Sequence, residues 1–266
     1  MKFRALAVTI AGAAVLAAGC APSQAPSSQP AGDGAVTAAP AASSTLTVFA
    51  AASLTGTFTA LGKQFETDNP GTKVSFNFLG SSDLAQQIVQ GAPADVFAAA
   101  SDSTMKTVTD AGLAAAAPKS FAKNILQIAT APGNPKGIAS FADLAKPDLK
   151  VVVCAKGVPC GDAAIKVETA TKVTLKPVSE EPDVKSALSK VQSGDADAAL
   201  VYVTDVTAAK GAVQGVSFPE AQQAITNYPI AVVKSSKQAA AAQKFEDLVT
   251  GELGQKTLQA AGFTAS

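Results

Sequence analysis

From about residue 45 onward, hydrophobic residues follow two alternating spacings. Short apolar runs typical of buried strands alternate with longer stretches in which apolar residues recur every three or four positions, as on one face of a helix. The pattern predicts strands at 45–50, 73–79, 95–99, 124–131, 150–154, 173–178, 197–203 and 227–234. It predicts helices at 54–68, 84–91, 103–111, 141–144, 161–171, 182–193 and 238–250.

This alternation is typical of an α/β fold with mostly parallel sheets and helices on both faces. Two apolar segments, Asn124–Thr130 and Tyr228–Lys234, enclose a complete α/β set of their own. If both cross between two lobes, residues 45–123 and 235–266 form lobe I and residues 124–234 form lobe II. The two crossover strands then act as a double hinge beside a cleft.

Two strand-to-helix turns in the first half carry hydroxyl groups. The sequence GSSDL places Ser81 and Ser82 where a strand leads into a helix, and AAASL does the same for Ser53. A serine at such a turn usually caps its own helix. Two such turns together could also aim N–H and O–H donors at one anion.

The second half offers three further donors. In KGVPCGDAAIKV, Pro and Gly flank Cys160, so its backbone N–H lies at a helix start. The segment EPDV, ending at Val184, opens another helix, with Pro182 and Asp183 expected in its first turn. Tyr202 ends the strand AALVYV and can donate its hydroxyl, although it could instead be a core aromatic satisfied locally.

Composition narrows the function. The chain of 266 residues has 21 basic and 21 acidic side chains and no His. A net charge of zero argues against binding to nucleic acid, which favours an excess of basic side chains. Without His, the chain lacks the commonest general base of enzymes. A hydrolase with Ser53 or Ser81 as nucleophile remains an alternative, but the chain has no G-x-S-x-G motif.

The first residues resemble an export signal. Lys2 and Arg4 precede an apolar run that is too short to span a bilayer and ends at AAGC, which predicts a signal peptide at 1–19. Cys20 is the expected lipidation site, with ordinary signal cleavage as the alternative. Residues 20–44, rich in Ala, Pro and Ser, then form a flexible lipid-anchored linker. The expected location is the extracytoplasmic face of the cell membrane.

Cys154 and Cys160 are the other two cysteines. In an exported protein they are expected to form a disulfide, because a metal site would need further Cys or His ligands.

Several motifs together carry a resemblance to a known family. In order they are TVFAAASLT, GSSDLAQQIVQGAPADVF, VPCG, PDVKSAL, ALVYVTD, YPIAVVK and AAGF. From Thr45 to Phe263 the chain resembles the molybdate-binding proteins of ATP-binding cassette (ABC) importers. The resemblance implies the type II periplasmic-binding-protein fold and a monomer that delivers molybdate, and also tungstate, to a membrane permease with its ATPase. No cofactor is implied.

The resemblance also implies how the anion is held. Neutral donors surround the oxyanion, and no protein atom binds the molybdenum directly. Matching motif by motif gives five molybdate-binding positions: Ser53, Ser81, Cys160, Val184 and Tyr202.

Asp83 departs from the family pattern, in which that position is commonly neutral. It could stabilise the first turn of its helix, or it could face the cleft and favour a protonated anion. A receptor for sulfate or another oxyanion therefore remains an alternative.

Overall fold

The computed structural model describes residues 44–266. The predicted signal peptide, the linker up to residue 43 and Cys20 lie outside this range. Within residues 44–266, no helix is both long and apolar enough to cross a membrane.

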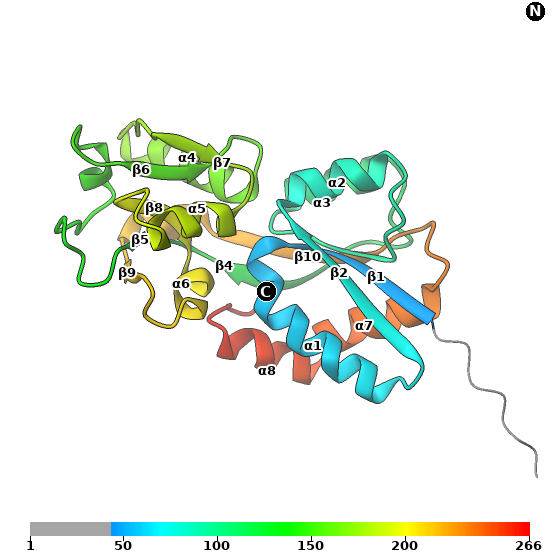
Figure 1. Cartoon of the computed structure of the whole chain (residues 1–266). Coiled ribbons are helices and arrows are strands. Elements are labelled where there is room, and N and C mark those ends of the chain that lie inside the picture. The colour runs from blue at the N-terminus through cyan, green and yellow to red at the C-terminus, as the bar shows by residue number, and fades with distance from the viewer. Residues whose placement is uncertain (1–43) are drawn as a thin grey trace, which may run out of the picture. The chain divides into compact units, whose positions relative to one another are not determined.

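The first of two five-stranded sheets has the strand order β2-β1-β3-β10-β4 (Figure 1). Its members are β1 (Ser44–Ala51), β2 (Thr72–Leu79), β3 (Val96–Ala98), β4 (Lys119–Asn124) and β10 (Thr226–Val232). β1 pairs in parallel with β2 and β3, whereas β10 is antiparallel to both β3 and β4. We call this sheet with its helices the first lobe.

Helices cover both faces of the first sheet because its strands are apolar on both sides. Val48 packs in a cluster with Phe58 and Phe245 on one face of the sheet. Its neighbour Phe49 points to the opposite face, where it packs in a cluster with Leu84. The helices on the Val48 face are α1 (Thr55–Asp68), α7 (Ala239–Thr250) and α8 (Glu252–Ala260). Those on the Phe49 face are α2 (Ser81–Val89) and α3 (Asp102–Asp110).

The second sheet has the strand order β7-β6-β8-β5-β9, and with its helices it forms the second lobe (Figure 1). Its strands are β5 (Leu126–Thr130), β6 (Val151–Cys154), β7 (Ser179–Glu181), β8 (Ala198–Tyr202) and β9 (Gln214–Val216). Its helices are α4 (Pro159–Thr171), α5 (Val184–Gln192) and α6 (Val203–Ala208), with short 3-10 turns η2 (Ala142–Ala145) and η3 (Pro219–Ala224). One apolar cluster fills this lobe.

The chain passes between the two sheets twice, at Ile125 and at Ile225. β4 ends at Asn124 and β5 begins at Leu126, while η3 ends at Ala224 and β10 begins at Thr226. Residues 226–232, which we expected in lobe II, pair within the first sheet. An apolar strand carries no local sign of the sheet with which it will pair, so the second boundary was expected about nine residues too late.

The α/β fold with two sheets agrees with the prediction, but both sheets are mixed where we expected mostly parallel pairs. One predicted strand is wrong: 173–178 is irregular, and β7 begins only after Pro177, which has no N–H for a ladder. α8, β4, β9, α6 and η3 had no counterpart in the pattern.

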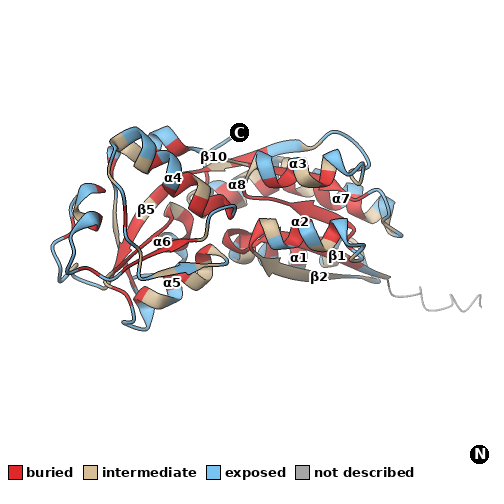
Figure 2. Ribbon diagram, turned by 90° about the horizontal axis from the view of Figure 1, so that it is seen from above, coloured by how far each residue is buried: buried red, intermediate tan, exposed pale blue. Residues whose placement is uncertain are grey.

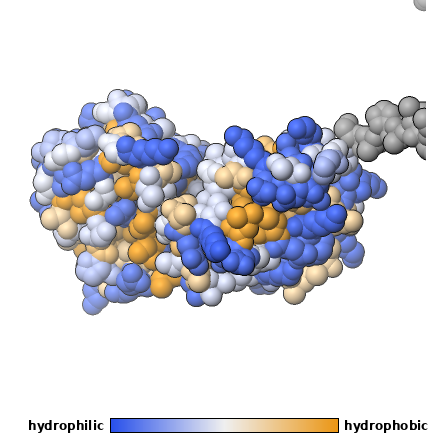
Figure 3. Space-filling view, turned by 90° about the horizontal axis from the view of Figure 1, so that it is seen from below, coloured by the Kyte–Doolittle hydropathy of each residue, from blue (hydrophilic) through white to orange (hydrophobic). Residues whose placement is uncertain are grey.

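Burial follows the sheets. The central strands and the inward faces of the helices are buried, whereas the edge strands β2, β7 and β9 are partly exposed and the outer helix faces are exposed (Figure 2). On the face seen in Figure 3, hydrophilic residues are interspersed with smaller hydrophobic groups. Few large apolar side chains are exposed; they are Val89, Ile165, Val178, Ile225 and Leu253.

Candidate functional site

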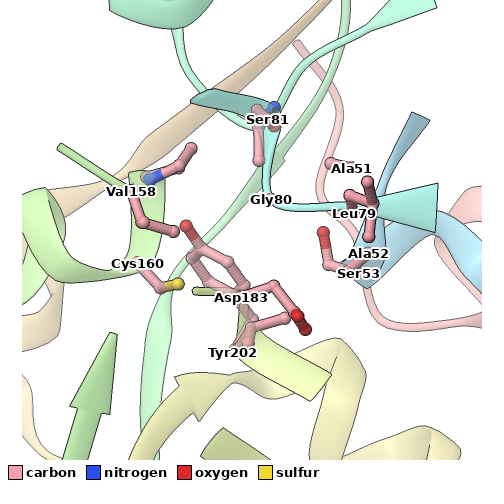
Figure 4. A pocket seen from close by; sticks show the side chains of 13 residues that line it. Ala51, Ala52, Ser53, Leu79, Gly80, Ser81, Val158, Cys160, Asp183 and Tyr202 are labelled. Carbon is pink, nitrogen blue, oxygen red and sulfur yellow. Dashed lines mark hydrogen bonds between the residues drawn. The ribbon is translucent and has the colours of Figure 1, made fainter. Parts of the chain in front are cut away.

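A small cavity lies where the two lobes face each other. The space between its lining atoms, including the part open to solvent, is about 210 Å³. All five residues that the sequence predicted as ligand contacts line the cavity, and Figure 4 labels Ser53, Ser81, Cys160 and Tyr202 among them. The full lining is Ala51, Ala52, Ser53, Leu79, Gly80, Ser81, Ala100, Val158, Pro159, Cys160, Asp183, Val184 and Tyr202.

Ser53 lies in the short 3-10 turn η1 (Ala52–Leu54) that joins β1 to α1. Alanines precede it, so the chain can turn sharply at the cavity wall without a bulky side chain. Ser53 is only 7% exposed, and its Oγ lies 2.9 Å from the Tyr228 hydroxyl. The Ser53 hydroxyl is therefore held in place by a residue of the same lobe.

Ser81 is the first residue of α2, and Gly80 is the N-cap. The Ser81 Oγ accepts a hydrogen bond from the Ala100 N–H at 2.9 Å. Because a backbone N–H can only donate, the Ser81 proton remains free to point elsewhere. Ser81 can thus give a hydrogen bond to an anion in the cavity.

Asp83 lies in the first turn of the same helix, where a carboxylate is stabilised by the helix dipole. It is exposed and does not line the cavity. The structure therefore supports a role for Asp83 in stabilising the first turn of α2 and not a position facing the cleft.

Cys160 is the second residue of α4, after Pro159. The first intrahelical bond comes from the Asp162 N–H to the Val158 carbonyl, so the Cys160 N–H precedes the helical ladder. The predicted disulfide is present between Cys154 and Cys160. It fixes the start of α4 to the end of β6.

Val184 begins α5, and Asp183 is its N-cap. We expected Asp183 within the first turn; it lies one position earlier because its carboxylate accepts the N–H groups of Lys185 and Ser186. This cap uses the second and third N–H groups of the helix. The cap leaves the Val184 N–H free, and Val184 is one of the residues that line the cavity.

Tyr202 ends β8 and is 1% exposed. Its hydroxyl has no hydrogen-bond partner within residues 44–266, although it points into the space enclosed by the other lining residues (Figure 4). Burial raises the pKa of the Tyr202 phenol. The group therefore stays protonated and can donate a hydrogen bond.

A charge pair lies behind this wall of the cavity. The Lys185 ammonium is 2.9 Å from the fully buried Asp205 carboxylate, which also accepts the Tyr202 N–H. Burial raises the Asp205 pKa, and the neighbouring Lys185 acts in the opposite direction. Lys185, which follows Val184 in the sequence, is thus paired with an acid of its own lobe.

Comparison with known proteins identifies the family. The profile of the family described as bacterial extracellular solute-binding protein matches residues 46–264. The chain belongs to this family. Nearly every described residue of this solute-binding protein lies within the match.

Named relatives agree with this assignment. The chain is 50% identical to the molybdate-binding protein ModA of Mycobacterium tuberculosis over 218 residues, covering 82% of this chain and 84% of that protein. It is 30% identical to the molybdate-binding protein ModA of Escherichia coli over 233 residues, covering 82% and 88%. The resemblance predicted from the motifs is confirmed.

A solved structure shows the same fold. The periplasmic molybdate-binding protein of Azotobacter vinelandii superposes with a TM-score of 0.70 at 24% identity, covering 83% of this chain and 99% of that one. The predicted two-lobed α/β fold of periplasmic binding proteins is therefore confirmed.

Two buried polar residues of this solute-binding protein escaped the sequence analysis. Tyr228, in β10, holds the Ser53 hydroxyl, and Asn124, at the end of β4, contacts Tyr228. The apolar pattern indicates only that both belong to crossover strands. No local pattern marks a residue that acts through another side chain about a hundred or more positions away in sequence.

Within residues 44–266, no group of three or more His, Cys, Asp or Glu side chains is placed to hold a metal ion. The cavity of this solute-binding protein instead brings together hydroxyl groups and the first N–H groups of helices.

Proposed function

We propose that this solute-binding protein binds molybdate, and also tungstate, in the cavity between its lobes and delivers it to the membrane permease of an ABC importer. The observation that carries the proposal is the donor set. Among residues 44–266, no group accepts the hydroxyl proton of Ser81 or Tyr202, and Val184 has a backbone N–H left free by its cap.

Neutral donors suit a buried dianion. Removing an anion from water is costly, and fixed N–H and O–H dipoles can replace its hydration shell. Lysine or arginine in the same place would leave the empty cavity with an unpaired buried charge. The start of α2 from one lobe and the starts of α4 and α5 from the other add partial positive charge.

Family membership supports a role in binding rather than hydrolysis. The Ser53 Oγ bonds to a tyrosine hydroxyl, and the Ser81 Oγ accepts a backbone N–H. A serine nucleophile needs a base that accepts its proton. Neither serine has a lysine or carboxylate among its hydrogen-bond partners in the described part of the chain.

Donors drawn from two lobes are satisfied together only when the lobes are close. Ser53 and Ser81 belong to the first lobe, and Cys160, Val184 and Tyr202 belong to the second. Binding is therefore expected to favour a closed form. We propose that the permease recognises this closed form.

Calorimetry of the purified chain with molybdate, tungstate, sulfate and hydrogen phosphate tests the proposal. We expect tight binding of molybdate and tungstate, because a smaller tetrahedral anion cannot reach all donors at once. Preference for sulfate would assign the cavity to another oxyanion, and the absence of any binding would contradict the proposal.

The lipid anchor is part of the same proposal. We infer that Cys20 is lipidated and holds a monomeric protein at the extracytoplasmic membrane face, because a lone terminal thiol is otherwise unexplained in an exported chain. Incorporation of a lipid probe into the wild-type chain but not into a Cys20→Ala variant is the expected result. Equal labelling of the two would contradict it.

A further inference from the structure

The Ser53 hydroxyl belongs to a buried chain of hydrogen bonds that reaches back to the crossing between the lobes. Its Oγ is 2.9 Å from the Tyr228 hydroxyl oxygen, and that oxygen is 3.4 Å from the Asn124 Nδ2. Tyr228 is 0% exposed and Asn124 is 2% exposed. Of these three residues, only Ser53 lines the cavity.

Asn124 determines which group donates and which accepts in this series of hydrogen bonds. The Ile125 backbone N–H donates to the Asn124 Oδ1 at 3.0 Å, which identifies that atom as the oxygen. The Nδ2 group then faces both the Thr204 Oγ1, at 2.8 Å, and the Tyr228 hydroxyl. An amide nitrogen donates and does not accept, so the Tyr228 oxygen is an acceptor toward Asn124.

The role of the Tyr228 oxygen as an acceptor determines the hydrogen bond between Tyr228 and Ser53. With its oxygen accepting from Asn124, the Tyr228 hydroxyl can donate its proton to the Ser53 Oγ, which lies 2.9 Å away. Burial raises the Tyr228 pKa, so that proton is retained. The Ser53 Oγ then accepts from Tyr228, and its own proton is left for the cavity.

We propose that Asn124 is a positioning residue that, through Tyr228, turns the Ser53 proton toward the bound oxyanion. The proposal rests on the proposed function of the cavity. It makes Ser53 equivalent to Ser81, whose oxygen is occupied by the Ala100 N–H. Asn124 is also the last residue of β4, and its amide contacts Thr204 of the second lobe. The residue that determines the orientation of the Ser53 proton thus lies where the chain crosses between the lobes.

The Asn124→Asp substitution reverses the donor and acceptor roles in this series of hydrogen bonds, with almost no change in the shape of the side chain. A carboxylate can still accept the Ile125 N–H, but it also accepts from Tyr228. Tyr228 must then accept from Ser53, and the Ser53 oxygen presents a lone pair to the ligand. We expect molybdate affinity to fall by about tenfold or more, the usual effect of losing a hydrogen bond to a charged group.

A double-mutant cycle with Ser53→Ala tests whether Asn124 acts through Ser53. In the Ser53→Ala background no hydroxyl proton remains to be redirected, so Asn124→Asp is expected to lower affinity by less than about threefold. An equal loss in both backgrounds would overturn the proposal and assign the effect to charge or to damage at the hinge.

Two controls complete the experiment. Asn134→Asp makes the same substitution at an amide that, like Asn124, accepts a backbone N–H, but that donates to a carbonyl and does not line the cavity. We expect it to leave affinity within about twofold. Circular dichroism of each variant shows whether it is folded. Failure of the unmodified chain to bind any oxyanion would overturn the proposed function, whereas binding without coupling between Asn124 and Ser53 would overturn the positioning role alone.

Discussion

Gly80, at the start of α2, lies directly against the carbonyl oxygen of Pro182, just before α5. A β-carbon on Gly80 would overlap that oxygen, which belongs to the other lobe. The backbone angles of Gly80 are ordinary for any residue. The glycine is therefore required by the approach of the lobes and not by the turn itself.

Gly80→Ala should weaken molybdate binding by about tenfold or more, because overlap with a rigid backbone atom typically costs 1–3 kcal/mol. The substituted chain should fold normally but close poorly. Calorimetry measures the affinity, and small-angle scattering with ligand measures closure. Gly56→Ala is the matched control, since a β-carbon there meets no atom within 4 Å. Equal affinities of the two variants would show that the lobes need not approach this closely.

Tyr202→Phe should raise stability and lower affinity together. The Tyr202 hydroxyl is buried without a hydrogen-bond partner among residues 44–266, so its removal should stabilise the fold by about 1 kcal/mol, or about 2–4 °C in Tm. Molybdate affinity should fall by about tenfold or more because one donor is lost. Thermal unfolding without ligand and calorimetry with it measure the two effects.

Tyr228→Phe is the contrasting variant. It removes a buried hydroxyl that is bonded to Ser53, so it should lower Tm where Tyr202→Phe raises it. Similar Tm shifts in both variants would contradict the assignment of Tyr202 as the unsatisfied donor.

Breaking the Cys154–Cys160 disulfide should cost about 2 kcal/mol of unfolding free energy, as expected for so short a loop. It should also weaken molybdate binding, because the bridge fixes the start of α4 that presents the Cys160 N–H. Affinity and urea unfolding are measured for the wild-type chain with and without reductant. In Cys154→Ser, reductant should have no further effect. Unchanged affinity in that variant would rule out a role for the bridge in binding.

Asp205 should make stability depend on pH. Burial raises its folded-state pKa above the unfolded value of about 4, with Lys185 opposing the shift. The stabilising contribution of this group is therefore complete below about pH 4 and is lost as pH rises through the raised pKa. Asp205→Asn removes this dependence and leaves Lys185, whose side chain is 34% exposed, within reach of water.

The expected result is that Asp205→Asn gains stability relative to the wild-type chain as pH rises above about 4. Urea unfolding of both proteins at several pH values measures the difference. A difference in unfolding free energy that stays constant over this range would show that the carboxylate pKa is not raised in the fold.

Much of the candidate site could be predicted from the sequence because each predicted ligand contact lies in a local motif. A serine after a strand and before a helix, as at Ser53 and Ser81, marks a turn whose geometry the neighbouring residues fix. The Asp183 cap and the Pro159 start of α4 follow the same local rules. The local motifs place these residues at the ends of their elements, and the fold brings all five to one cavity.

Other features depend on which segments meet in space. Residues 226–232 are apolar in the sequence, and only pairing with β3 and β4 places them in the first sheet. Asn124 and Tyr228 act on Ser53 from 71 and 175 positions away, distances that no periodicity records. Asp83 could have faced the cleft or the solvent until the rotation of α2 against the sheet was known.

The sequence by itself determined the α/β order, the disulfide partners and the positions of the proposed donors at helix starts and strand ends, because capping, strand periodicity and short loops are local properties. The tertiary structure alone decided the boundary of the lobes, the closeness of Gly80 to Pro182 and the direction of the Ser53 proton. These depend on contacts between distant segments, and their energies are set by packing and hydrogen bonding that no single stretch of the chain contains.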